Sequence, residues 1–355
     1  MSSQSMNAVV VRGAGDLQIE KRPIPIPHTG EVLIRVKYAG ICGSDLHYYH
    51  EGSVGAFAIR EPLVVGHEIV GTVERDTRSG ADALPHNTPV AIHPATPGMA
   101  LPGLEDRPSI WPGSRYLGSA ATQPHTQGGM SEFIVARSDQ IRALPAGLPL
   151  RRAVLAEPLG VALHALNRGG GVRGKRVLVS GAGPVGLLAA GAAVALGASQ
   201  VASSDVIPEP LARAAALGVT DTYLIDRNGG NPPKQSFDLV IECSGSPSAV
   251  STAIASAVPG GVVVQVGMLP AGLISVDLSQ LISREIDVRG AFRFNDEITE
   301  AVTLLASDDD LEQIVTDVFG LDEVVAAFDR AADAKASGKV VIDLSEPSTP
   351  TIDKR

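Results

Sequence analysis

The sequence predicts an α/β fold built from a β-rich region and a doubly wound parallel sheet. In residues 8–141 the apolar runs are short and β-branched, and Gly and Pro separate them, which is typical of strands and turns. After about residue 150, apolar strands alternate with Ala-rich helical segments, as in βαβ units. The 355 residues give room for about two domains of roughly 150 residues each.

The β-rich region contains clear strand candidates, such as VLIRVKYAG (residues 32–40) and EIVGTVER (68–75). Periodicity is then lost over residues 95–127, a stretch too long for an ordinary connection. We expect an irregular lobe there.

The second region has a regular order of elements. Strands are predicted at residues 175–181, 200–205, 237–245, 260–267 and 286–292, and helices at 184–197, 209–218 and about 248–258. Helices near 296–306 and 321–336 and a strand at 338–344 follow. We expect this tail to return to the first region, so that residues 1–157 and 293–355 form one domain and 158–292 the other.

Composition excludes several classes of protein. With 29 basic and 39 acidic residues the net charge is −10, and no block of Lys or Arg could follow a nucleic-acid backbone. No apolar stretch reaches about 18 residues, so a membrane span is not expected. Two cysteines cannot form a disulfide framework, and the first residues lack the features of a signal peptide, which favours a cytoplasmic setting.

A dinucleotide site is predicted at the first strand-to-helix turn of the second region. There a GxGxxG motif follows a strand and begins a helix. The backbone amides of the turn and the dipole of the helix favour binding of a pyrophosphate. The motif residues are Gly181, Gly183, Pro184, Val185 and Gly186. Asp205 ends the next strand, 19 residues after Gly186, where an acidic group meets the adenosine ribose. Its charge would repel a 2′-phosphate, so NAD is favoured over NADP.

A metal site is predicted in the β-rich region. Cys42, His67 and Glu68 offer a thiolate, an imidazole and a carboxylate, a mixture suited to zinc. The 25-residue spacing from Cys42 to His67 matches no zinc finger. Three protein ligands with an open position describe a catalytic rather than a structural zinc.

Four motifs in order, GICGSD, GHEIVGTV, Glu157-Pro158-Leu159 and GAGPVG, resemble the zinc-dependent medium-chain alcohol and polyol dehydrogenases over nearly the whole chain. The segment HYYHEGSVGAF, with Glu157, is most similar to the L-idonate 5-dehydrogenases and the sorbitol or xylitol dehydrogenases. This resemblance implies a GroES-like catalytic domain, a Rossmann domain for NAD, and hydride transfer between that cofactor and a secondary alcohol of a sugar acid or polyol.

The resemblance also implies residue roles. Cys42 and His67 would bind zinc, while Glu68 and Glu157 would either bind it or hold its water. Ser44 and His47 match the proton relay, and the backbone of Val266, Gly267 and Met268 matches the nicotinamide site. The substrate side of the cleft would comprise Tyr48, Phe57, Arg293 and Phe294, with Arg293 also near the cofactor.

The lobe at 95–127 contains no cysteine, although many relatives bind a structural zinc there. We therefore expect one zinc per subunit and a lobe held by Trp111, Tyr116 and its prolines. A homodimer or homotetramer is expected. The alternatives are a sorbitol or xylitol dehydrogenase, a zinc-free reductase of the same superfamily, and a non-catalytic nucleotide-binding protein.

Overall fold

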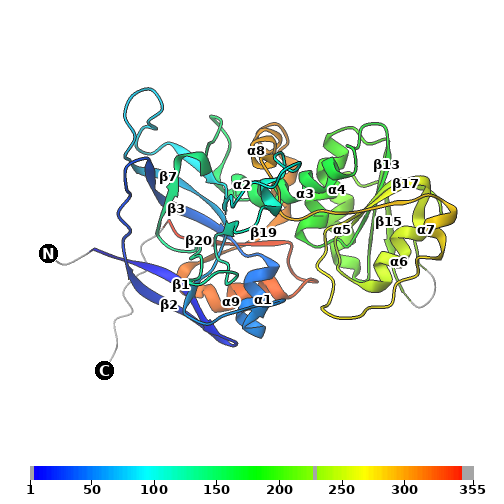
Figure 1. Ribbon diagram of the computed structural model, residues 1–355, viewed down its shortest axis with the longest axis horizontal. Coiled ribbons are helices and arrows are strands. Elements are labelled where there is room, and N and C mark those ends of the chain that lie inside the picture. The colour runs from blue at the N-terminus through cyan, green and yellow to red at the C-terminus, as the bar shows by residue number, and fades with distance from the viewer. Residues whose placement is uncertain (1–3, 227–229, 346–355) are drawn as a thin grey trace.

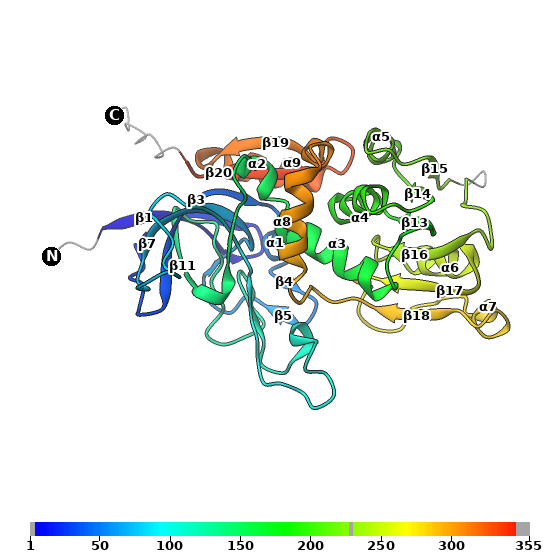
Figure 2. The same ribbon diagram turned by 90° about the horizontal axis from the view of Figure 1, so that it is seen from above.

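The computed structural model describes residues 4–226 and 230–345, and its elements form two parts that lie side by side along the longest axis (Figure 1). One part is built mainly from strands of the first half of the chain. The other is a sheet covered by helices, formed from the middle of the chain. Helices α3 (Ala156–Arg168) and α8 (Glu297–Ser307) lie where the two parts meet (Figure 2). The α/β class that the sequence predicts is confirmed.

The β-rich part is organised around a seven-stranded sheet. Its path is β12-β8-β7-β3-β20-β19, and β11 also pairs with β3. The strands are β3 (Glu31–Gly40), β7 (Glu68–Asp76), β8 (Pro89–Ile92), β11 (Phe133–Arg137), β12 (Ile141–Ala143), β19 (Val315–Gly320) and β20 (Lys339–Asp343). Strand β20 joins β3 antiparallel, with Val341 opposite Gly40, so the last described strand lies inside this sheet, between β3 and β19.

Smaller elements surround that sheet. Strands β2, β1 and β6 form a three-stranded sheet, and two short hairpins pair β4 with β5 and β9 with β10. The bounds are β1 (Ser5–Gly13), β2 (Asp16–Pro23), β4 (Ser53–Val54), β5 (Phe57–Ala58), β6 (Leu63–Val64), β9 (Ala95–Thr96), β10 (Arg115–Tyr116), α1 (Gly43–Glu51), α2 (Leu150–Ala153) and α9 (Val324–Ala332). Short 3-10 turns lie at Pro108–Ile110, Ser138–Gln140, Asp310–Ile314 and Leu321–Glu323.

The second part is a six-stranded parallel sheet in the order β15-β14-β13-β16-β17-β18. Because this order reverses at β13, a crevice opens at the carboxyl ends of β13 and β16, where such sheets bind ligands. The elements are β13 (Arg176–Ser180), α4 (Pro184–Ala195), β14 (Gln200–Asp205), α5 (Pro208–Ala216), β15 (Asp221–Leu224), β16 (Phe237–Glu242), α6 (Pro247–Ser256), β17 (Ala257–Gln265), α7 (Ser279–Ser283) and β18 (Asp287–Gly290).

The largest core cluster runs through both α3 and α8 and joins the two parts. Leu159 and Leu163 of α3 are fully buried, as is Ile298 of α8. Among the described residues, no helix combines the length and apolar character that a membrane span needs.

Candidate active site

Cys42, His67 and Glu68 meet at the junction of α1 and β7. A sulfur of Cys42, a ring nitrogen of His67 and a carboxylate oxygen of Glu68 all lie within 4.8 Å of one another. His67 and Glu68 are buried, whereas Cys42 is partly exposed. The structure therefore brings together the three metal-binding candidates that the sequence predicts, and thiolate, imidazole and carboxylate form a donor set that suits zinc.

Glu68 is held by a residue from the far end of the chain. Its Oε1 accepts a hydrogen bond from Lys339 Nζ at 2.6 Å, and Lys339 also donates to the Ile41 carbonyl at 3.0 Å. Its Oε2 is buried and has no hydrogen-bond partner among the described residues. A buried carboxylate oxygen without a donor is costly unless a cation occupies the position in front of it, so the site fits a metal ion.

Gly40 makes room for this carboxylate. A Cβ atom at position 40 would lie 1.9 Å from Glu68 Oε2, and Gly40 faces Glu68 across the β3–β7 ladder. Any larger residue would displace the acid.

Asp45 belongs to the same centre. It is completely buried, and its carboxylate accepts backbone hydrogen bonds from Cys42 and Gly66, each at 3.0 Å. Burial lowers the pKa of His67, but the charges of Cys42, Asp45 and Glu157 raise it by more, so that the pKa lies well above the usual value. Asp45 was not predicted as a site residue from the sequence; its position in the first turn of a helix that follows Cys42 is the signal that could have found it.

Glu157 approaches from the first turn of α3. Its side chain is buried, and its Oε1 accepts a hydrogen bond from the Tyr116 hydroxyl at 2.5 Å. Burial raises the pKa of Glu157 to about 7, with His67 opposing the shift and Glu68 adding to it. Glu157 is not part of the compact group formed by Cys42, His67 and Glu68. The two carboxylates thus differ in their surroundings.

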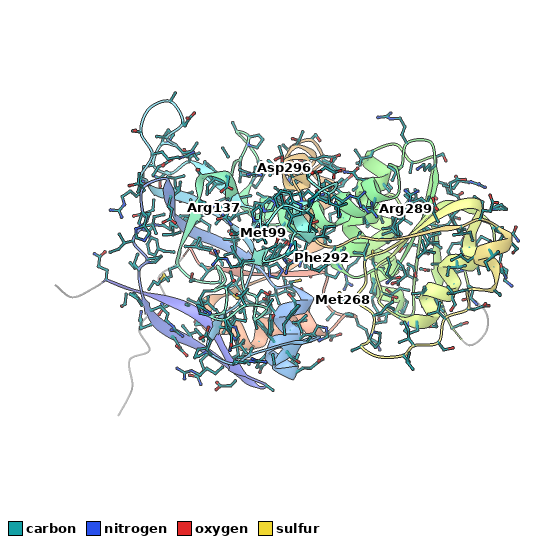
Figure 3. All side chains as sticks on the ribbon, in the orientation of Figure 1. Met99, Arg137, Met268, Arg289, Phe292 and Asp296 are labelled. Carbon is teal, nitrogen blue, oxygen red and sulfur yellow. The ribbon has the colours of Figure 1, made fainter. Side chains whose placement is uncertain are left out.

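Arg293 reaches the site from the connection between β18 and α8. Its guanidinium carbon lies 4.1 Å from the centre of the Tyr116 ring and 4.8 Å from that of Phe292. Figure 3 shows Phe292 and Met268 between the two parts of the molecule. Arg293 has a φ of 54°, a left-handed conformation that turns the chain here.

The structure does not support the predicted substrate contact of Phe294. This side chain is 1% exposed and lies in the core, with its ring 4.8 Å from that of His93 and against Gly160 of α3. Arg293, which separates Phe292 from Phe294 in the sequence, has a left-handed backbone conformation. The side chain of Phe292 is therefore exposed while that of Phe294 is buried, so Phe294 is a packing residue.

Helix α1 carries three further candidates. Ser44 is partly exposed, and the exposed His47 pairs through Nδ1 with Glu51 Oε1 at 2.9 Å. Tyr48 is buried, and its hydroxyl accepts a hydrogen bond from the Ala120 amide at 2.9 Å. Phe57 lies on β5 with 45% of its surface exposed.

The glycine-rich turn joins β13 to α4 in the crevice of the parallel sheet. Gly181 has a φ of 92°, and a Cβ on Gly186 would lie 1.9 Å from the Gly181 carbonyl oxygen, so both positions need glycine. Gly183 is exposed, with Pro184 and Val185 partly so. Asp205 accepts hydrogen bonds from the amides of Ala182 (2.7 Å) and Ile207 (2.9 Å), which fixes its carboxylate beside this turn.

The loop after β17 lies close to the loop after β16. Gly267 packs so tightly that a Cβ there would lie 2.2 Å from the Gly245 amide nitrogen. The amides of Val266 and Gly267 both donate to the Glu242 carbonyl, while Met268 is 72% exposed. Cys243 packs against the core, and burial raises the pKa of its thiol.

Comparisons with known proteins agree with this geometry. A family described as "Alcohol dehydrogenase GroES-like domain" matches residues 28–146, and one described as "Zinc-binding dehydrogenase" matches residues 184–307. L-idonate 5-dehydrogenase (NAD(P)(+)) of Escherichia coli (strain K12) is 36% identical over 302 residues, 84% of this chain and 87% of that protein. Sorbitol dehydrogenase of Macaca fascicularis is 33% identical over 335 residues, 91% of each chain.

Solved structures show the same relationship. The crystal structure of L-idonate 5-dehydrogenase from Escherichia coli K-12 superposes with a TM-score of 0.88 and 33% identity, covering 96% of this chain and 98% of that one. The β-rich part is thus GroES-like and the parallel sheet Rossmann-like. By sequence and by structure, the chain belongs to the zinc-dependent medium-chain polyol dehydrogenase family.

Proposed function

We propose that this dehydrogenase transfers a hydride between the secondary alcohol of a sugar acid and NAD, with L-idonate and 5-ketogluconate as the substrate pair. The observation that carries the proposal is the compact Cys42–His67–Glu68 group, in which a buried Glu68 oxygen has no hydrogen-bond partner among the described residues. The similarity to L-idonate 5-dehydrogenase supports the choice of substrate.

Cys42, His67 and Glu68 would hold the metal, with Glu157 beside it as a group that positions water or the substrate oxygen. A bound zinc ion supplies Lewis acidity, which lowers the pKa of an alcohol and stabilises the developing alkoxide. The proton released from the alcohol would pass by way of Ser44 to His47. Because the His47 ring is exposed, it can exchange that proton with solvent.

The remaining roles concern the two ligands. Tyr48, Phe57 and Arg293 would contact the substrate, and the guanidinium of Arg293 is suited to a carboxylate. The glycine-rich turn at Gly181, Gly183, Pro184, Val185 and Gly186 would bind the pyrophosphate, and Val266, Gly267 and Met268 the nicotinamide amide, near Arg293. Asp205 would accept from the ribose hydroxyls, which favours NAD over NADP.

We propose one zinc per subunit, because the sequence has two cysteines and neither lies in the lobe at 95–127. We further propose domains at 1–157 with 293–355 and at 158–292, a homodimer or homotetramer, and a reducing cytoplasmic setting, which the two free cysteines favour.

A sorbitol or xylitol dehydrogenase is the second candidate. The observation that favours it is the 33% identity to sorbitol dehydrogenase over 91% of both chains. The two candidates differ in charge, since L-idonate carries a carboxylate and the polyols do not. A strong preference for L-idonate would therefore indicate a cation at the substrate site, a role for which Arg293 is the candidate.

The function is tested by NADH formation with zinc-loaded protein and L-idonate, D-gluconate, sorbitol or xylitol, with and without a chelator. We expect turnover of L-idonate that the chelator abolishes and added zinc restores. Cys42→Ser should lose both zinc and turnover, whereas Cys243→Ser, the matched control, should keep both. Turnover that survives complete zinc removal would contradict the proposal, and turnover of polyols alone would select the second candidate.

A further inference from the structure

Tyr116 connects the cysteine-free lobe to the metal centre. It lies on β10, whose pairing with β9 places Tyr116 opposite Ala95. The side chain is 6% exposed and touches three candidates of the site: Glu157 through its hydroxyl, Arg293 through its face, and His67, whose ring centre is 5.6 Å away. From the sequence, Tyr116 was expected only to pack the lobe and had no role in the chemistry.

The hydroxyl of Tyr116 controls the orientation of Glu157. In the part of the chain that the structure describes, it is the one group that donates a hydrogen bond to the Glu157 carboxylate. A buried carboxylate with a single donor is oriented by that donor, because rotating away would leave both groups unpaired. The bond engages Oε1, and Glu157 stands outside the compact group formed by Cys42, His67 and Glu68.

The face of the same ring positions Arg293. Its guanidinium carbon lies 4.1 Å from the ring centre. None of the ion pairs among the described residues includes Arg293. A stacked arginine keeps its in-plane N–H groups available for an anion. The ring thus orients a cation without neutralising it.

We propose that Tyr116 is a positioning residue of the active site: its hydroxyl holds Glu157 off the metal and its ring presents Arg293 to a substrate carboxylate. This inference rests on the proposed function. Packing alone does not account for Tyr116, because phenylalanine would fill the same space without burying a hydroxyl against a carboxylate.

Three variants separate the two contributions. Tyr116→Phe removes the hydroxyl alone, and Tyr116→Leu also removes the aromatic face. Trp111→Phe is the matched control, since it breaks a hydrogen bond inside the lobe, from Trp111 Nε1 to the Leu104 carbonyl, and leaves the contacts of Tyr116 with Glu157 and Arg293 in place.

The first readout is the visible absorption spectrum of the protein loaded with Co²⁺ in place of zinc, which reports coordination geometry without turnover. In Tyr116→Phe the released Glu157 should change the cobalt bands, and kcat should fall about 10- to 100-fold, as for other partners that orient groups around a metal. The KM for NAD should stay unchanged. Tyr116→Leu should in addition raise the KM for L-idonate about tenfold, with a smaller rise for sorbitol.

The outcomes distinguish the two proposals. If the wild-type protein shows no chelator-sensitive turnover, the proposed function fails, and the cobalt spectra still report on Glu157. If the wild type is active and Tyr116→Phe matches it in both spectrum and kcat, Tyr116 is packing and the inference is wrong. If Trp111→Phe changes the cobalt spectrum and kcat as much as Tyr116→Phe does, the inference is also wrong, because the loss of activity would then come from disturbing the lobe as a whole.

Discussion

At the scale of single residues, Glu68 and Lys339 form a buried ion pair. Both side chains are at most 3% exposed. Burial lowers the pKa of Lys339, but Glu68, together with Cys42 and Glu157, raises it by more, so the ammonium stays charged. One carboxylate oxygen contacts the lysine while the other is left for a metal ion. The lysine and the metal therefore share the stabilisation of one buried anion.

Replacing Lys339 with methionine tests whether the lysine and the metal both stabilise the Glu68 carboxylate. The variant leaves Glu68 buried without its partner, and we expect the metal-free protein to lose about 3 kcal/mol in its free energy of unfolding. The zinc-loaded protein should lose less, because the metal supplies a second positive charge. Urea unfolding with zinc and with chelator measures both values. In the metal-free state, adding Glu68→Gln should recover much of the loss; equal losses with and without zinc would contradict the prediction.

Asp205 gives a prediction about the choice of cofactor. Its carboxylate is fixed by two backbone amides beside the glycine-rich turn. Asp205→Ala removes both the acceptor for a ribose hydroxyl and the charge that repels a 2′-phosphate. We expect the ratio of kcat/KM for NAD to that for NADP to fall about tenfold or more, the equivalent of one charge-assisted hydrogen bond. Steady-state kinetics with both cofactors measures the ratio, and an unchanged ratio would remove Asp205 from the site.

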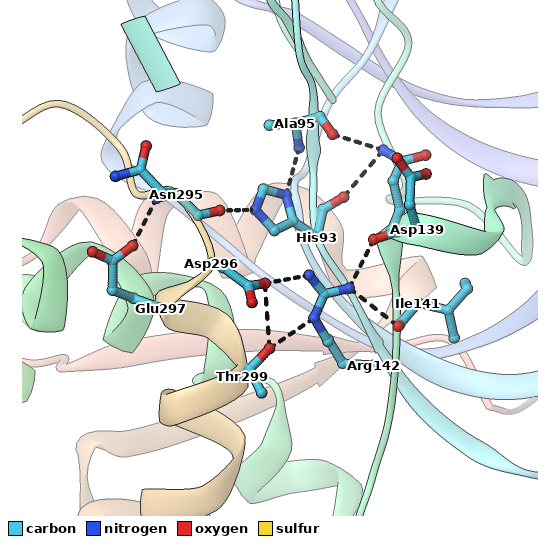
Figure 4. Close-up of polar contacts among 10 residues, drawn as sticks. His93, Ala95, Asp139, Ile141, Arg142, Asn295, Asp296, Glu297 and Thr299 are labelled. Carbon is cyan, nitrogen blue, oxygen red and sulfur yellow. Dashed lines mark hydrogen bonds and ion pairs between the residues drawn. The ribbon is translucent and has the colours of Figure 1, made fainter. Parts of the chain in front are cut away.

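At the scale of elements, the connection between β18 and α8 is tied to the β-rich part by a set of polar contacts (Figure 4). His93 Nε2 donates to the Asn295 carbonyl at 2.6 Å, while His93 Nδ1 accepts from the Ala95 amide at 3.1 Å. Arg142 pairs with Asp296 and donates to Thr299 Oγ1 at 2.9 Å. These contacts fix the segment that carries Arg293.

The two bonds of His93 require a neutral ring, which gives a pH dependence. Burial lowers the pKa of His93 below 6.5, with the Asn295 carbonyl opposing the shift. Below about pH 6.5 the unfolded chain then binds a proton that the folded protein binds less readily, so stability falls as the pH decreases. Urea midpoints between about pH 7 and 5 should fall less steeply in His93→Leu than in the wild type. The exposed His86→Leu serves as control, and parallel curves for His93→Leu and wild type would refute this account.

The sequence predicted the elements far better than the contacts between them. Alternation and glycine placement located β13, α4 and β14 with the turn between them, and the family motifs located Cys42, His67 and Glu68. Tyr116 and Lys339 were not predicted as site residues, because their partners lie 41 and 271 residues away and no local pattern records such contacts. Phe294 was wrongly predicted to contact the substrate. The direction of its side chain depends on the backbone conformation of Arg293, and the sequence Phe292-Arg293-Phe294 does not indicate that conformation.

At the scale of the whole molecule, the parallel sheet ends in an open edge. β18 pairs on one side with β17, and no other described strand pairs with it. Val288 on this strand is 46% exposed, and two apolar residues of the preceding segment are more so, with Ile282 of α7 83% and Leu273 fully exposed. A natural edge strand is normally protected by charge, cover or pairing. We therefore expect a second copy of the chain to pair with β18.

A twofold antiparallel pairing centred on Val288 would place Asp287 of one copy opposite Arg289 of the other, a favourable cross-strand pair. It would also place Val288 against its own copy, so Val288→Glu would set two like charges face to face. Light scattering should give a multiple of 36.7 kDa for the wild type and about the monomer mass for Val288→Glu. Val288→Thr, which keeps the branched side chain, should remain assembled. A monomeric wild type, or a Val288→Glu variant of unchanged mass, would show that this edge is not the interface. Val288 belongs to the parallel sheet, whereas Cys42 and His67 belong to the β-rich part, so zinc content should stay the same in every case.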